Sequence, residues 1–183
     1  MKVKDIVLTA AGLLGIAQEV RGYIDGEGNG GKANTESLLQ AFNLIEGELA
    51  LDYLPLLAEE IVAVEDGSVA YKKLSKTLAR IIAVRDESGK DVRFTLLPTQ
   101  LRVDEKRVKV EYAYLPESKD LDGETDYESR ASVGLIAYGV AAAYCAARGL
   151  YAEAEFWDKK YKACLARICG KSRGGRIRGR TWV

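Results

Sequence analysis

The run from Ala131 to Ala147 constrains the fold of this chain more than any other segment. Almost every side chain in these 17 residues is small or apolar. A helix that is apolar on nearly all sides has to be covered on nearly all sides. The run is just short of the roughly 20 residues that span a bilayer. It therefore predicts either the central helix of a soluble bundle or a helix enclosed between subunits, and no membrane span.

Capping signals limit this helix at both ends. Thr125 and Glu128 form a capping-box pattern, which predicts a helix that starts at Asp126. Arg148 followed by Gly149 is a usual stop signal. The predicted helix therefore covers residues 126–148.

A further helix is predicted over residues 150–169. Its apolar seam consists of Leu150, Ala154, Trp157, Tyr161, Leu165 and Ile168. Charged residues occupy the other faces. We expect Trp157 to be buried in the seam, so that its replacement by alanine costs about 3–5 kcal/mol.

Two helices are also predicted before the middle of the chain. Residues 5–24 carry an apolar stripe at helical spacing. Residues 34–53 carry another, which Asn34 or Thr35 would cap and Pro55 would end.

The chain contains no sequence motif that is typical of an enzyme or of a metal-binding protein. It contains no histidine, which is the commonest general base and the commonest metal ligand. The glycine-rich residues 25–33 match parts of two nucleotide-binding motifs, but each motif needs a preceding strand and a helix precedes here. The acidic residues 117–126 lack the spacing of a calcium loop. We therefore predict no catalytic residue, no cofactor and no metal, and we interpret residues 25–33 as a flexible connection.

Between residues 59 and 115 the apolar period changes from about 3.6 to 2 residues. Asp66-Gly67 and the residues 87–90 are turn signals, and Pro116 closes the last alternating run. We expect four to six short antiparallel strands that form a small sheet or sandwich, inserted between two pairs of helices. The exposed edges of such a sheet would need covering, which indicates neighbouring molecules.

Composition adds three limits. With 48% apolar residues the chain can bury a core, and residues 1–169 suit a single domain. Residues 170–183 hold five basic side chains and no acid, so the remainder has 22 basic against 27 acidic residues, a net charge of −5. The odd number of cysteines, three, indicates a reducing compartment. The predicted fold is α+β: a bundle of about four helices with an inserted β-sheet and an extended basic C-terminal arm.

The arm has three possible roles. Its candidate partner-binding residues are Lys171, Arg173, Arg176, Ile177, Arg178, Arg180, Trp182 and Val183. Tryptophan and arginine are favoured anchors of protein interfaces, which makes docking on a partner the first interpretation. A solvated tail, or a salt-dependent contact with nucleic-acid phosphates, are the alternatives.

The sequence resembles the head–tail connector, or adaptor, proteins of tailed bacteriophages and prophages. The likeness is carried by the segments Leu38 to Ala50, Asp52 to Pro55, Tyr112 to Pro116, Tyr138 to Cys145 and Gly149 to Tyr161. Their order along the chain matches such proteins over most of its length. The motifs are those of structural packing.

This resemblance implies a virion structural protein in the phage neck, assembled in the host cytoplasm. It implies a homo-oligomeric ring, often dodecameric, that lies beneath the portal protein and above a tail or neck protein. Double-stranded DNA would pass through the lumen, and the C-terminal arm would reach toward the portal or a neighbouring subunit. The alternative is a nucleic-acid-binding protein that uses the basic arm.

Overall fold

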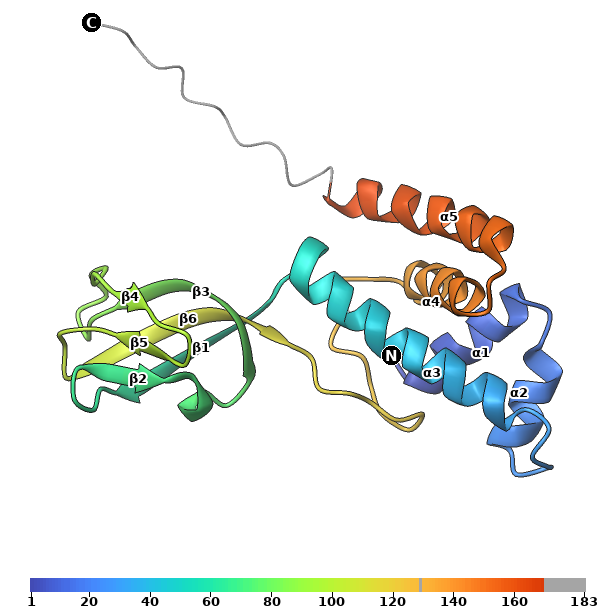
Figure 1. Ribbon diagram of the computed structural model, residues 1–183, viewed down its shortest axis with the longest axis horizontal. Helices are drawn as coiled ribbons and strands as arrows, with labels where there is room; N and C mark the ends of the chain where they lie inside the picture. Colours follow the sequence, from blue (N-terminus) through green and yellow to red (C-terminus); the bar gives the residue numbers. More distant parts are fainter. Residues whose placement is uncertain (129, 170–183) are drawn as a thin grey trace, which may run out of the picture. The chain divides into compact units, whose positions relative to one another are not determined.

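The computed structural model describes residues 1–128 and 130–169. Over these residues it contains five α-helices and two three-stranded antiparallel sheets, which confirms the predicted α+β fold (Figure 1). The chain divides into two compact units, whereas a single domain was predicted. The helical unit comprises Met1–Ile45 and the chain from Lys119 onward, and the β unit comprises Glu46–Ser118.

The apolar run forms the central helix of the helical unit. The helices are α1 (Val3–Leu13), α2 (Ala17–Ile24), α3 (Lys32–Glu48, whose last turn belongs to the β unit), α4 (Val133–Ala147) and α5 (Tyr151–Cys169). α4 packs against both α1 and α5, and nine of its 15 residues are buried. The chain's own helices thus cover α4, as the bundle alternative predicted.

The single helix predicted over residues 5–24 is wrong, because the structure breaks it into α1 and α2. Gly15 has a φ of 74°, a conformation that favours glycine. The amide of Gly15 donates to the carbonyl of Gly12, and the amide of Ile16 donates to the carbonyl of Ala11. These two bonds form a Schellman motif, which closes α1 at that point.

The predicted start of α4 at Asp126 is also wrong. The helix begins at Val133, and its N-cap is Ser132, whose side chain accepts a hydrogen bond from the amide of Leu135. The Thr125 hydroxyl instead accepts from the amide of Tyr127. The backbone just before it pairs with the start of the chain, since residues Lys2 and Glu124 form an antiparallel bridge. Tertiary pairing therefore replaces the local capping signal.

Residues 25–31 connect α2 to α3, and at Gly31 the backbone comes close to that of Glu19 on α2. A Cβ added at Gly31 would lie 2.1 Å from the carbonyl oxygen of Glu19, so the backbones fit together only with glycine at this position. α3 begins at Lys32, two residues before the predicted cap at Asn34. Helical structure continues to Tyr53 through a π-helical turn, Leu49–Tyr53, before Pro55, as predicted.

Gly139 lets three helices of the helical unit come together. A Cβ at this position would lie 2.9 Å from Cγ2 of Ile45 on α3 and 3.1 Å from Cε2 of Tyr161 on α5. Tyr161 and Leu165 are the buried residues of α5. The seam predicted on α5 is therefore correct at these two positions, and a glycine on α4 makes room for it.

The β unit contains six strands. They are β1 (Leu56–Ala63), β2 (Ser68–Ala70), β3 (Thr77–Arg85), β4 (Thr95–Leu96), β5 (Gln100–Arg102) and β6 (Arg107–Leu115). One sheet has the order β1-β6-β3 and the other β2-β5-β4. The predicted turns at Asp66-Gly67 and residues 87–90 lie where the chain reverses, with positive φ at Asp66, Gly67 and Gly89. The strand that follows the second turn, β4, is only two residues long.

Alternation along β6 builds the core of this unit. Val108, Val110 and Tyr112 are buried. They pack with residues of both sheets in one cluster, which also contains Val69, Leu74, Val84, Leu101 and Val103. The predicted sandwich is thus formed by two small sheets that share one apolar core.

A polar cluster ties β1 to the segment before β3. The Glu60 carboxylate accepts hydrogen bonds from the Ser75 amide at 3.1 Å, from the Ser75 hydroxyl at 2.6 Å and from the Tyr112 hydroxyl. Partial burial raises the pKa of Glu60, but the bonds from Ser75 and Tyr112 outweigh it, so the pKa is lowered overall. Burial and the bond to Glu60 raise the pKa of Tyr112.

Candidate functional site

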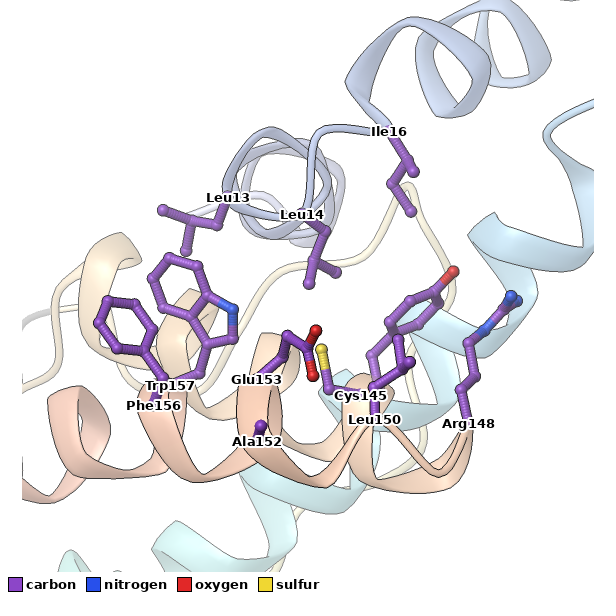
Figure 2. A pocket seen from close by; sticks show the side chains of 11 residues that line it. Leu13, Leu14, Ile16, Cys145, Arg148, Leu150, Ala152, Glu153, Phe156 and Trp157 are labelled. Carbon is purple, nitrogen blue, oxygen red and sulfur yellow. The ribbon is translucent and has the colours of Figure 1, made fainter.

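The partner-binding residues predicted from the sequence lie outside the described residues. They are Lys171, Arg173, Arg176, Ile177, Arg178, Arg180, Trp182 and Val183. The site that the structure describes is a cleft in the helical unit, with a volume of about 650 Å³ (Figure 2). This is within the roughly 300–1,000 Å³ of pockets that hold ligands.

Two helix ends form the cleft. Leu13, Leu14 and Ile16 come from the end of α1, and Leu150 follows the end of α4. The end of α4 repeats the hydrogen bonding of the α1 end: Gly149 has a φ of 74°, and the amide of Leu150 donates to the carbonyl of Cys145. The predicted stop at Gly149 is confirmed. Each Schellman motif therefore presents the residue after its glycine, Ile16 or Leu150, to the cleft.

Aromatic rings of α5 line the opposite side of the cleft. Trp157 stacks on Tyr138 of α4, with ring centroids 5.9 Å apart and an interplanar angle of 14°. Phe156 meets the Trp157 ring edge-on at 4.8 Å and is 52% exposed. Trp157 is half-buried, so the prediction that it is buried in the core is wrong. Its indole lies between the bundle and the open cleft, close to Leu13 in Figure 2.

The polar groups at the cleft include a thiol, a guanidinium and a carboxylate. Burial, followed by the nearby carboxylate of Glu153, raises the pKa of the Cys145 thiol. A thiol that stays protonated is a poor nucleophile. The Arg148 guanidinium stacks on the Tyr144 ring at 4.4 Å and donates to Oδ1 of Asn34 at 2.7 Å. It is thus engaged with the protein itself.

Glu153 differs from the other acids of α5. Glu155 pairs with Lys159 at 2.7 Å, and Asp158 pairs with Lys162 at 2.7 Å. Glu153 takes part in no salt bridge among the described residues, and Figure 2 places its carboxylate at the cleft. The cleft therefore combines apolar walls with a negative charge that has no cationic partner in the described part of the chain.

A second hollow, of about 450 Å³, lies between α3 and α4. It is lined by Ser37, Gln40, Ala41, Leu44, Ala143, Tyr144, Ala147 and Arg148. Leu44 is 65% exposed there. Tyr144 and Arg148 line both the cleft and this hollow. The other apolar side chains that line the two are different.

The β unit also exposes apolar residues. Leu57 and Ile61, at 55% and 63% exposed, point to the same side of β1. The salt bridge between Lys109 and Glu59, at 2.7 Å, lies between them on that side. β1 pairs with β6 over its whole length and with no other named strand.

Neither a metal centre nor a membrane span emerges from residues 1–128 and 130–169. They contain no group of three potential metal-ligating side chains, and no helix among them is long and apolar enough to cross a bilayer. No protein-family model matches the chain, and no curated protein matches it by sequence.

Sequence reasoning did not find the cleft. Its signals in the sequence are the apolar residues around Gly15 and after Gly149, which by their spacing also belong to the apolar stripe and the apolar seam. Their convergence depends on how α1 packs against α4, and the sequence pattern does not contain that information.

Proposed function

We propose that this protein is a virion structural protein, a head–tail connector that forms a ring beneath the portal of a tailed bacteriophage. The ring would join the capsid to a tail or neck protein and let double-stranded DNA pass. Two lines support this proposal. One is the resemblance carried by residues 38–55, 112–116 and 138–161, and the other is an α+β architecture with a helical unit and an inserted β unit.

The observation that carries the proposal is the pair of apolar hollows in the helical unit. A closed ring needs a heterologous interface, in which one patch of each subunit binds a different patch of the next. The cleft exposes Leu150 and Phe156, and the hollow between α3 and α4 exposes Leu44. Exposed apolar groups of this kind favour contact with another protein surface. The exposed apolar side chains of this contact thus come from α3, from α5 and from the residue after α4, and not from the buried face of α4.

Native mass spectrometry of the full chain tests the proposal. We expect a closed ring, for which the resemblance implies twelve subunits. Leu44→Glu or Phe156→Glu should prevent its formation, because each places a charge in an apolar contact. Leu57→Glu, which adds the same charge in the β unit, is the matched control and should leave the ring intact.

Mixing the two defective variants tests the heterologous geometry. A subunit with Leu44→Glu keeps an intact cleft, and one with Phe156→Glu keeps an intact hollow between α3 and α4. The mixture should therefore form heterodimers that cannot close into a ring. A chain that stays strictly monomeric and does not bind a portal ring would contradict the proposal.

The basic arm decides between the proposal and its alternative. A portal-docking arm predicts that Trp182→Ala weakens binding to the portal. A nucleic-acid-binding protein predicts that the combined change of Arg176, Arg178 and Arg180 to alanine abolishes DNA retention at low salt. Retention of DNA by a monomer, lost in that variant, would favour the alternative.

A further inference from the structure

We propose that the cleft between α1 and α5 binds the chain's own segment 176–183, with Trp182 seated among Leu13, Leu14 and Trp157. The proposal concerns the isolated subunit and does not depend on ring formation. Four features of the chain support it: the apolar character of the cleft, the reach of the segment, its composition and the charge of Glu153.

The cleft suits an aromatic side chain. Leu13, Leu14 and Ile16 form one wall, and Phe156 and Trp157 contribute from α5 (Figure 2). A tryptophan buries about 150–250 Å² of surface and pairs favourably with another ring in an edge-on or offset arrangement. Phe156 and Trp157 already form such an edge-on pair at one side of the cleft.

The segment is long enough to reach the cleft of its own chain. α5 ends at Cys169, and Trp157 lies 12 residues earlier, which corresponds to about 18 Å of helix. The 13 residues from Gly170 to Trp182 span up to about 43 Å when extended. A reversal of direction is compatible with the four glycines at positions 170, 174, 175 and 179.

The composition of the segment matches the walls of the cleft. Its large apolar residues are Ile177, Trp182 and Val183. The rest of the segment is arginine, glycine or threonine, so Trp182 and its neighbour are the anchor that can fill an apolar cleft. A covalent connection gives this anchor a high effective concentration, which a second copy of the chain has to match.

Charge favours the same occupant. Glu153 lines the cleft and takes part in no salt bridge among the described residues, whereas Glu155 and Asp158 pair with lysines on α5. The segment carries three basic residues, Arg176, Arg178 and Arg180, and no acid. An arginine close to Trp182, such as Arg180, would meet the Glu153 carboxylate when the indole enters the cleft.

Fluorescence of the full chain tests the proposal. The chain has two tryptophans, so Trp157→Phe leaves Trp182 as the only reporter. We expect a blue-shifted emission and severalfold weaker quenching by acrylamide than in the same chain unfolded in urea. At concentrations at which native mass spectrometry shows only monomers, both effects should be independent of protein concentration, because the contact is intramolecular.

Matched variants establish where Trp182 binds. Leu14→Glu should restore quenching, whereas Leu57→Glu, an equal change in the β unit, should not. Glu153→Lys should also raise quenching, whereas Glu155→Lys should leave it unchanged. Far-UV circular dichroism checks that each variant is folded, and ¹⁹F NMR of the 5-fluorotryptophan-labelled chain repeats the measurement with Trp157 in place.

Three outcomes would overturn the proposal. The first is a Trp182 that is as accessible in the folded chain as in urea. The second is protection that Leu14→Glu and Glu153→Lys do not reduce. The third is protection that develops only as the protein concentration rises, which would identify a second copy as the occupant. Ring formation is measured separately by native mass spectrometry, so none of these outcomes decides the proposed function.

Discussion

Replacing Gly139 by alanine tests how closely the central helices pack. The change adds one methyl group to the face of α4 that meets α3 and α5. That methyl would lie 2.9 Å from Cγ2 of Ile45 and 3.1 Å from Cε2 of Tyr161. Tyr161 is almost fully buried and Ile45 is branched at Cβ, so neither side chain can move away freely.

Two opposing terms set the expected magnitude. Overpacking a core costs about 1–3 kcal/mol. Alanine gains about 1 kcal/mol over glycine in a helix interior. Gly139→Ala should therefore change the free energy of unfolding by between about zero and 2 kcal/mol in the destabilising direction. Gly139→Val adds more atoms and a β-branch, so it should destabilise further.

The matched control is Gly134→Ala in the same helix. No atom lies within 4 Å of a Cβ built at Gly134, so this variant should gain up to about 1 kcal/mol. Urea unfolding followed by circular dichroism at 222 nm reports on the helical unit. A transition with two steps would show that this unit unfolds separately from the β unit. The reasoning fails if Gly139→Ala stabilises the protein as much as Gly134→Ala does.

Three further changes test other contacts. Glu60→Gln should make the free energy of unfolding less dependent on pH. The pKa of Glu60 is lowered in the folded state, so its contribution to stability is present above the usual value of 4.5 and is lost as the pH falls through the folded-state pKa. Urea unfolding at several pH values would detect the difference. Ser132→Ala should cost about 0.5–2 kcal/mol in the same melts, because it removes the N-cap of α4. Gly31→Ala should lower the thermal midpoint sharply, because its methyl would overlap a backbone carbonyl, whereas Gly30→Ala meets no atom within 4 Å and should be tolerated.

The elements that the sequence predicted well are those with a strong local period. The last alternating run before Pro116 is β6, in which Val108, Val110 and Tyr112 are buried, and the predicted seam contains Tyr161 and Leu165, the buried residues of α5. In both cases one face of the element is buried and the other is solvated, so the spacing of the apolar residues shows which face points toward the core.

The errors arose where tertiary contacts replace local signals. The capping pattern at Thr125 fits a helix start by itself, but the backbone beside it pairs with the start of the chain, and α4 begins only at Val133. Trp157 belongs to an apolar seam, yet it is half-buried, because the seam is less covered in the N-terminal half of α5 than at Tyr161 and Leu165. Periodicity gives the face on which a residue lies, but not how far its neighbours extend over it.

The cleft shows how a local motif and the packing of helices combine into a site. A Schellman motif needs a left-handed residue and turns the chain so that an apolar residue follows it. Gly15 and Gly149 provide the two left-handed positions, and Ile16 and Leu150 are the apolar residues that follow. The packing of α1 against α4 brings these two ends to the same cleft. Alanine at either glycine would strain the backbone by about 1–3 kcal/mol, so it should loosen one wall of the cleft while the opposite wall on α5 stays in place.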